Sequence, residues 1–351
     1  MQQQSLSSQI QQFDDDVSAN EWFQQQGWTD GLPIVPPTPA LVSAALSEAL
    51  LEANQLIGVE PVRERAISAE KLAINAVMAG CLPSHFPLVV TAISAMLQPE
   101  FVLHGATAST GGCAVLAVIN GPARNTIGAD SSFNVLGSSD RATTAIGRAI
   151  RLILYNLFDV RPGEVDRSTL GHPGKISYCL SEDEEGTEWE PLAQERGAPR
   201  FASAVTVMAA GAPRQIMNEW TTDPAQILDT YVAEIKANML HYSIHAGNYA
   251  IIVPPQLREH FARANWSKAD IRHYVHEHAR VQRGQWEHCG KGAIVLEQGE
   301  REYRALNSAD DLLVIAAGGP AGGFGAVIPP WLGRTSKAVT LAVGACVDCE
   351  I

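Results

Sequence analysis

The hydrophobic pattern of the chain predicts an α/β protein. Three apolar runs of strand length end in turns rich in glycine and proline, over 114–124, 204–214 and 312–321. Because both of their faces are apolar, these runs predict strands buried in a sheet that helices cover. A further strand is expected over 249–253. The likeness of the three runs indicates either an internal repeat or the common pattern of strand-to-helix turns.

The helical segments are delimited by caps and breakers. Helices are expected over 21–26, 39–54, 88–97 and 141–158, and between Ser68 and Gly80. Ser68 is a suitable N-cap, and Ser138 or Ser139 can cap the last helix. Gly147 lets another segment approach that last helix closely.

A proline-rich segment precedes the second of these helices. Trp28-Thr29-Asp30-Gly31-Leu32-Pro33 leads into a stretch with four prolines in seven positions, 33–39. Proline fixes φ and favours extended backbone. The segment is therefore predicted to be a rigid strap packed on the body, or else the edge of a substrate lid that carries Trp28 and Asp30.

An acidic, turn-rich stretch over 181–190 predicts a boundary between two α/β halves, 1–190 and 191–351. Each half is expected to hold buried, mostly parallel or mixed strands with covering helices. The first half contains the strap and Cys113, and the second contains a histidine cluster and a glycine-rich turn. A site is expected at their junction.

Composition narrows the possible partners and location. The formal net charge is −13, without any cluster of Lys and Arg, which disfavours nucleic acid and anionic membrane. The first 16 residues lack the basic and apolar regions of a signal peptide, and six cysteines in 351 residues suggest reduced thiols, so a cytoplasmic protein is expected. With 46% apolar and only 18% charged residues, a homo-oligomer acting on a small molecule is predicted.

The segment from His104 to Cys113 is the first candidate for chemistry. It contains small hydroxyl residues and two glycines, and it leads directly into a predicted strand. A thiolate is a strong nucleophile when a neighbouring His or exposed N–H groups lower its pKa. Cys113 is therefore the expected nucleophile, with His104 or His172 as its base; the alternative is a small buried residue that begins a strand.

Residues 171–179 form the second candidate segment. Its Pro-Gly turn presents His172 and Lys175 and precedes Glu182, and such a turn can stabilise an anionic or carbonyl-like group. The glycine spacing is not that of a Walker motif. The glycines after residue 317 are interrupted by Pro320 and no βαβ unit follows, so no cofactor is expected.

Two other patterns support different chemistry. His241 and His245 have the i, i+4 spacing of many zinc sites, but the glutamate of a metallopeptidase does not follow. Cys346 and Cys349 form a C-x-x-C pair next to the C-terminus, which predicts a redox-active pair or half a metal site, or a lightly tethered tail. A non-catalytic oligomeric binding module is the remaining alternative.

Several phrases of the sequence resemble one bacterial family. Residues 28–38, 75–81, 119–122, 147–149 and 171–175 look like a group of largely uncharacterised proteins classed loosely with UGSC-type thiol or selenol proteins. The resemblance implies a reactive thiol and thus favours Cys81 and Cys113, although the chain has no selenocysteine and no U/C-Gly-Ser-Cys element. Residues expected to contact a substrate are Asn75, Cys81, Asn120, Arg148, Lys175 and Glu182.

These features together predict a thiol-dependent hydrolase or lyase. A cysteine nucleophile suits the polarised carbon–nitrogen bond of a small amidine, guanidine or nitroguanidine-like molecule, because a covalent intermediate divides one difficult hydrolysis into two steps. Cys113 is preferred to Cys81, since the end of a helix disfavours a thiolate.

Overall fold

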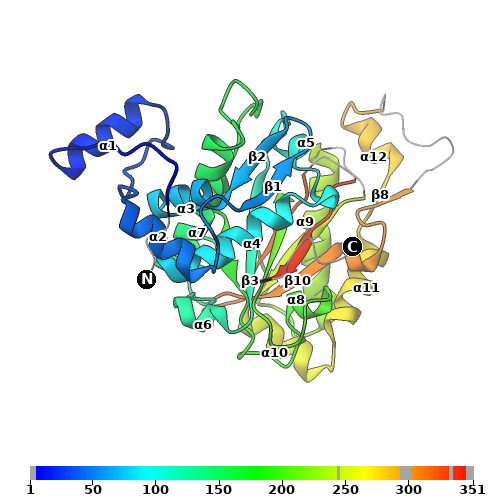
Figure 1. Ribbon diagram of the computed structural model, residues 1–351. Coiled ribbons are helices and arrows are strands. Elements are labelled where there is room, and N and C mark those ends of the chain that lie inside the picture. Colours follow the sequence, from blue (N-terminus) through cyan, green and yellow to red (C-terminus); the bar gives the residue numbers. More distant parts are fainter. Residues whose placement is uncertain (1–4, 243–245, 293–301, 332–334, 345–351) are drawn as a thin grey trace, which may run out of the picture.

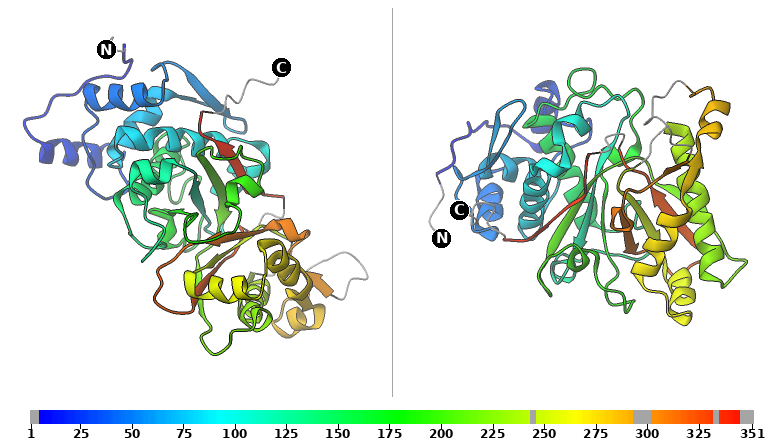
Figure 2. Two further views of the ribbon diagram at one scale, coloured as in Figure 1. Left: turned by 90° about the horizontal axis from the view of Figure 1, so that it is seen from below. Right: turned by 90° about the vertical axis from the view of Figure 1, so that its right-hand side faces the viewer.

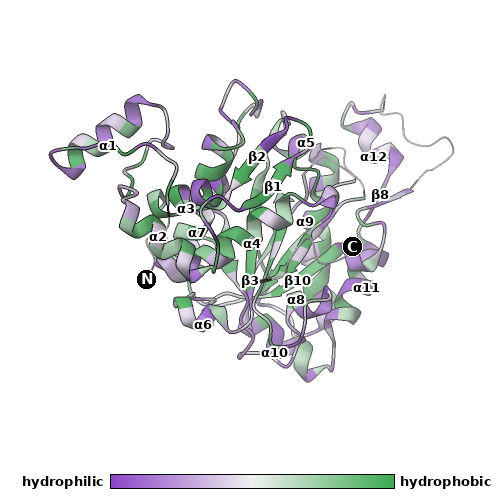
Figure 3. Cartoon of the chain, in the orientation of Figure 1, coloured by the Kyte–Doolittle hydropathy of each residue, from purple (hydrophilic) through white to green (hydrophobic). Residues whose placement is uncertain are grey.

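The computed structural model describes residues 5–242, 246–292, 302–331 and 335–344. Helices and mixed sheets alternate in it, which confirms the predicted α/β class with sheets covered by helices (Figure 1). The apolar runs of the sequence form its central strands (Figure 3).

The first sheet has the strand order β12-β5-β3-β4. Its strands are β3 (Ala114–Asn120), β4 (Cys179–Ser181), β5 (Ala204–Ala210) and β12 (Val339–Ala342). Strand β3 is parallel to β4 and antiparallel to β5, and β5 is antiparallel to β12.

The second sheet repeats this arrangement. Its strands are β6 (Arg214–Met217), β7 (Tyr249–Val253), β10 (Leu312–Ala316) and β11 (Phe324–Ile328), in the order β10-β7-β11-β6. Strand β10 is parallel to β7, whereas β11 is antiparallel to both β7 and β6. The pattern of directions is therefore the same as along β4-β3-β5-β12.

The two sheets exchange their last strands. Strand β6 follows β5 directly but joins the second sheet, and β12 follows β11 but joins the first. The two connections hydrogen-bond to each other, since Gly211 N donates to Pro329 O (2.9 Å) and Trp331 N to Ala209 O (2.8 Å). The exchange joins the two sheets through the backbone.

The topology bears on the predicted repeat and boundary. The equivalent strands are β3 with β7, β4 with β10 and β5 with β11, so the three similar runs β3, β5 and β10 do not occupy one repeated position. Their likeness reflects buried strands that end in similar turns. The division of strands between the sheets does not coincide with residue 190, because β5 and β12 both lie in the first sheet; as a domain boundary, residue 190 stays a prediction.

Helices cover the outer face of each sheet, and the inner faces pack together. Along β3, Leu116 and Val118 belong to the core between the sheets, while Ala117 and Ile119 face the helices, as the alternation of a strand requires. The first sheet is covered by α4 (Phe86–Met96) and α7 (Arg141–Asn156), on which α3 (Ala69–Met78) packs. The second is covered by α9 (Pro224–Tyr242) and α11 (Lys268–His278), and α10 (Pro255–Arg263) packs on α9. The result is four layers, helix, sheet, sheet and helix (Figure 2).

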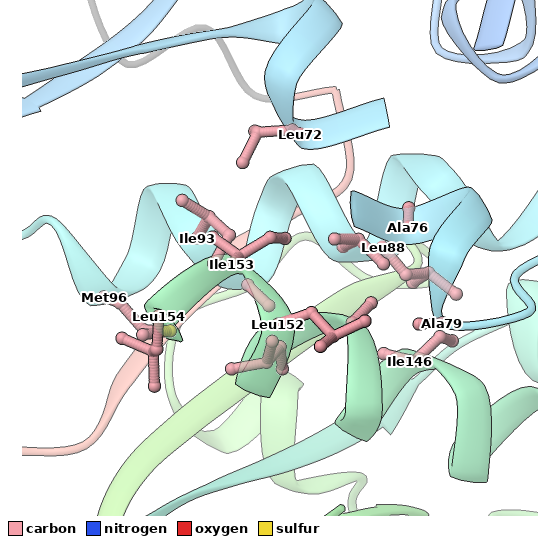
Figure 4. Close-up of a cluster of buried hydrophobic side chains, with 14 of the residues drawn as sticks. Leu72, Ala76, Ala79, Leu88, Ile93, Met96, Ile146, Leu152, Ile153 and Leu154 are labelled. Atoms are coloured by element: carbon pink, nitrogen blue, oxygen red, sulfur yellow. The ribbon is translucent and has the colours of Figure 1, made fainter. Parts of the chain in front are cut away.

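The outer core of the first half is formed largely by α3, α4 and α7. Leu72, Leu88 and Ile153 are fully buried there, and Figure 4 shows these side chains together between the helices. This core fixes α7, which borders the site described below.

The remaining elements are short and lie mostly in the connections. They are α1 (Asp16–Gln25), α2 (Pro39–Glu48), β1 (Leu56–Glu60), β2 (Arg65–Ser68), η1 (Pro83–His85), η2 (Pro99–Phe101), α5 (Leu103–Thr107), α6 (Ala123–Ile127), η3 (Pro173–Lys175), α8 (Leu192–Glu195), β8 (Arg280–Gln282), α12 (Arg283–His288), β9 (Glu302–Arg304) and η4 (Ala309–Asp311).

Several helix ends differ from the prediction. The N-cap of α7 is Asp140, whose Oδ1 accepts from Thr143 N at 2.8 Å, so the prediction of Ser138 or Ser139 was wrong. Asp140 Oδ2 also accepts from Asp130 N, which ties the preceding loop to the cap. Helix α2 ends at Glu48 rather than 54, and α1 starts at Asp16 rather than 21.

The proline-rich strap packs along α7. Arg148 donates to both oxygens of Asp30, at 2.9 and 2.8 Å, and Asn156 donates to Trp28 O at 2.9 Å. Arg161 Nη1 donates to Gly27 O at 2.6 Å. These bonds hold the strap on the body, which agrees with the prediction of a packed strap.

Within the part of the chain that is described, no single helix has the length and hydropathy of a membrane span. The segments Pro83–Met96 and Pro99–Thr107 meet these criteria only as a pair, which is bent by 72°.

Gly147 provides a test of the packing of α7 against β4. A Cβ at Gly147 would lie 2.8 Å from Tyr178 N, so Gly147→Ala should lower the free energy of unfolding by roughly 2–3 kcal/mol despite the better helix propensity of alanine. Gly284→Ala in α12 is the matched control, because its Cβ would meet no atom within 4 Å, and it should stabilise by about 0.5–1 kcal/mol. Urea unfolding measures both; equal effects would contradict the close approach.

Candidate functional site

Cys113 lies immediately before β3, where two glycine-containing loops touch. Gly112 has φ +70°, and a Cβ there would lie 2.9 Å from the backbone of Gly171. Thr169 N donates to Thr110 O at 3.1 Å across the same contact. The contact brings the turn that carries Lys175 next to Cys113.

A small cavity of about 30 Å³ opens beside the thiol. Its chemically active lining is Cys113, Arg151 and Lys175. The rest of the lining is Ala106, Thr107, Ala114, Val115, Gly147, Ile150, Leu154, Val160, Gly174 and Ala209. The volume has room for about one water molecule.

A buried carboxylate holds the cations of this cavity. Lys175 Nζ donates to Asp166 Oδ2 at 2.6 Å and to Ser168 Oγ at 2.7 Å, and Ser168 Oγ donates to Asp166 Oδ1 at 2.5 Å. Arg151 Nη1 lies 3.8 Å from Asp166 Oδ2. Burial alone would raise the pKa of Asp166, but the hydrogen bonds from Lys175 and Ser168 outweigh it and lower the pKa. Asp166 is therefore ionised and fixes Lys175 in place.

The Cys113 thiol is protonated at neutral pH. The side chain is half-buried, and its Sγ–H donates to Ala106 O at 3.1 Å. Burial raises the pKa of the thiol to about 12, while the charge of Lys175 lowers it and that of Asp166 raises it. Removal of the thiol proton thus requires a change in its surroundings.

Neither histidine predicted as the base is hydrogen-bonded to Cys113 among the described residues. His172 Nδ1 accepts from Gly174 N at 3.2 Å, which leaves Nε2 to donate to Ala210 O at 3.3 Å. Burial lowers the pKa of His172, so the ring is neutral and holds the Pro173–Lys175 turn. His104 lies on α5, and its Nδ1 is buried without a hydrogen-bond partner.

Asn120 and Glu182 lie at the opposite end of β3 from Cys113. The Glu182 side chain is 1% exposed, and its carboxylate accepts hydrogen bonds from four groups of the chain. The donors are Asn120 Nδ2 (2.7 Å), Leu192 N (2.6 Å), Lys268 Nζ (2.9 Å) and Ala316 N (3.3 Å). A substrate that contacts Glu182 would have to displace one of them; as substrate contacts, Asn120 and Glu182 stay predictions.

Asn75, Cys81 and Arg148 do not line the cavity of Cys113. Asn75 accepts from Asn156 Nδ2 at 2.7 Å beneath the strap, and Arg148 binds Asp30. Cys81 follows α3, and burial raises the pKa of its thiol to about 12, against a lowering effect of Arg141. The thiol pKa is therefore raised to the same value in Cys81 and Cys113. The two thiols differ in their neighbouring charges, which are Arg141 for Cys81 and Lys175 with Asp166 for Cys113.

Three residues of the site were missed by sequence reasoning. Arg151 lies on α7, and no motif of the sequence marks it as part of a site. Asp166 and Ser168 belong to the long connection over 157–178, and a connection of that length is itself a signal, since long loops in compact domains are commonly functional.

The alternative sites are only partly within the described residues. His241 is exposed near the end of α9, whereas His245, Cys346 and Cys349 lie outside the described residues. In the described ranges, no group of three or more His, Cys, Asp and Glu side chains is arranged to hold a metal ion. The metal and redox alternatives stay predictions.

No family model matches the chain, and neither the curated proteins nor the solved structures contain a match.

The protonation state of Cys113 predicts how its thiol is alkylated. With a pKa near 12, about one thiol in 10⁵ is ionised at pH 7, so iodoacetamide should modify exposed Cys289 first and Cys113 far more slowly. The Cys113 rate should rise about tenfold per pH unit up to pH 10. Peptide mass spectrometry measures the labelling of each cysteine separately. If Cys113 is labelled rapidly at pH 7 and its rate does not rise with pH, its thiol is already ionised and the prediction is wrong.

Proposed function

We propose that the protein is a thiol-dependent hydrolase or lyase that cleaves a polarised carbon–nitrogen bond, or another carbon–heteroatom bond, in a small nitrogen-rich molecule. The observation that carries the proposal is the cavity in which the Cys113 thiol meets two cations, Arg151 and Lys175, one of them oriented by Asp166 and Ser168. Nucleophile, proton carrier and orienting group are the parts that such a reaction needs.

Lys175 is better placed than either histidine to move the proton. Cys113 sulfur forms a bond to the electrophilic carbon and the carbon–nitrogen bond breaks. Lys175 gives a proton to the departing nitrogen, and the thiol proton restores the ammonium group. Water then breaks the carbon–sulfur bond, with its hydroxyl on carbon and its other proton returned to sulfur. Asp166 and Ser168 keep Nζ in position throughout.

The charges of the cavity favour a neutral substrate within the proposed class. Arg151 and Lys175 carry two positive charges against the single carboxylate of Asp166. A protonated amidine or guanidine would add a third positive charge, which a site with little water disfavours. A neutral, electron-poor carbon such as that of a nitroguanidine-like molecule develops negative charge during attack, and the two cations stabilise it.

Substrate entry requires the cavity to enlarge. The space beside Cys113 holds about one water molecule, which is less than any molecule of the proposed class. The connection over 157–178 contributes Val160, Gly174 and Lys175 to the wall, and its Leu170 is 94% exposed. We infer that displacement of this connection admits the substrate, with Asp166, Ser168 and Lys175 moving together so that the hydrogen bonds to Nζ are kept.

The proposal includes a reducing, cytoplasmic location and small-molecule chemistry. Cys81, Cys113, Cys179 and Cys289 are free thiols. A net charge of −13 supports a partner other than nucleic acid or anionic membrane.

Cys113→Ser tests the nucleophile. Turnover of neutral nitroguanidine-like, amide and nitrile compounds by the wild type, followed by release of amine or ammonia, should fall by at least about 10³-fold in the variant, with its thermal midpoint nearly unchanged. Cys289→Ser is the matched control and should keep full activity, because Cys289 is exposed. Retained activity in Cys113→Ser would refute a thiol mechanism at this site.

Lys175→Met tests the role of the cation. Because Lys175 lowers the thiol pKa, its removal should slow alkylation of Cys113 at pH 9 and reduce kcat by roughly 10²-fold or more. It should also reduce the ratio of kcat/KM for neutral compounds to kcat/KM for cationic compounds, relative to the wild type. An unaltered alkylation rate together with unaltered kcat would exclude Lys175 from the reaction.

A further inference from the structure

Exposed apolar side chains gather near the N-terminus. Twenty large apolar side chains are exposed within the described ranges, and eight of them belong to residues 10–50. These eight are Ile10, Phe13, Val17, Trp28, Leu32, Val35, Leu41 and Leu50. Apolar side chains concentrated in this way mark an interaction surface rather than the scattered exposure of an ordinary monomer.

Residues 5–26, named here the N-terminal arm, stand away from the rest of the molecule. Ser7 and Ser8 bind the buried carboxylate of Glu70, and Asn20 Oδ1 accepts from Ile34 N at 2.6 Å. Between these two anchors, residues 9–18 are all exposed. Helix α1 projects beyond α2 and α3 in Figure 1 and in the left view of Figure 2.

The arm is nevertheless rigidly organised. The rings of Phe13, Trp22, Phe23 and Trp28 form one cluster, with centroids 5.3 to 5.9 Å apart. The hydrogen bonds from Ser8 and Ser7 to Glu70 outweigh burial and lower its pKa to about 2, so this anchor is ionised at neutral pH. Phe23 packs against the core of the first half, while Ile10, Phe13 and Val17 stay exposed. The arm is therefore anchored to the body and still presents apolar side chains for contact with another molecule.

A hollow of about 1140 Å³ lies between the arm and the body. Val42 of α2 and Ile74 and Met78 of α3 give its body side an apolar part, which Phe13 and Trp22 face from the arm. Glutamine and aspartate side chains of the arm form much of the remaining lining, and covering the apolar part alone is favoured by the hydrophobic effect.

We propose that this surface joins two copies of the chain, with the arm of each copy packed against the arm and α2 of its partner. Each partner of a stable interface buries about 800 Å². The eight residues are 36% to 91% exposed, and Ile10, Phe13 and Trp28 among them also line the hollow, so an interface of that size would use these side chains together with the apolar lining of the hollow. A symmetric pair uses the same surface twice.

A second copy fits this surface better than a lipid or nucleic acid partner. Asp14, Asp15 and Asp16 lie on the exposed stretch of the arm, so anionic membranes and phosphate backbones are repelled. The same carboxylates repel the arm of a second copy, so the contact between two copies depends on apolar burial and should strengthen as the salt concentration rises. The apolar side chains of the arm and the apolar part of the hollow occur on one chain, so a second copy supplies both complementary parts.

The double variant Ile10→Asp/Val17→Asp tests the surface. Ile10 and Val17 are 69% and 70% exposed, so the exchange should leave the fold of the single chain intact. Light scattering of the wild type should give at least twice the chain mass of 37.7 kDa at micromolar concentration. The double variant should dissociate, with a dissociation constant raised at least about 100-fold and a circular dichroism spectrum unchanged.

Leu170→Asp is the matched control, because Leu170 is 94% exposed on a different loop and its exchange should leave the mass unchanged. If the wild type has a mass of 37.7 kDa at all micromolar concentrations, the proposal is wrong. This holds even if the monomer binds anilinonaphthalene sulfonate, a small apolar probe, because the surface would then bind small apolar molecules rather than a second copy. A wild-type oligomer that keeps its mass and dissociation constant in the double variant also overturns the proposal, since the interface is then elsewhere.

Discussion

The buried carboxylate of Glu182 is the interaction on which the arrangement of the two sheets depends. A carboxylate that is 1% exposed is costly unless donors surround it, and its four donors come from β3, α8, α11 and β10. Its main counter-charge, Lys268, is itself buried and binds Glu195 as well. The pairs contribute little net stability by themselves, but they are satisfied only when both sheets occupy these positions.

This network also determines where a site can lie. Parallel strands in open α/β sheets usually carry ligands at their carboxyl ends. Here the carboxyl ends of β3 and β4 carry Asn120 and Glu182, whose polar groups bind other parts of the chain, and Arg258 of α10 pairs with Asp183 in the same region. Cys113 stands at the amino end of β3, with Lys175 beside it from a neighbouring loop. The network therefore occupies one end of β3, and the candidate site lies at the other end.

Local patterns of the sequence were sufficient to predict the strands but not the site. The runs that became β3, β5, β7 and β10 are apolar on both faces, and burial between two layers leaves that signature directly in the sequence. The exchange of β6 and β12 depends on pairing between segments more than 100 residues apart, for which a single sequence carries no signal. The burial of Glu182 could not be predicted from the sequence, because it depends on Lys268, 86 residues away. Asp166 was missed for a different reason, because its partners Ser168 and Lys175 are close in the sequence but no motif marks the loop that brings them together.

The state of the Cys113 thiol constrains any mechanism at this site. A pKa near 12 means that ionising the half-buried thiol costs several kcal/mol more than in water, even with Lys175 nearby. In the proposed reaction that cost is offset if a substrate carbon accepts the sulfur as the proton leaves, because the negative charge then moves to an atom that Lys175 and Arg151 face. A neutral resting thiol is therefore compatible with nucleophilic chemistry, and in the proposed reaction its reactivity depends on the bound substrate.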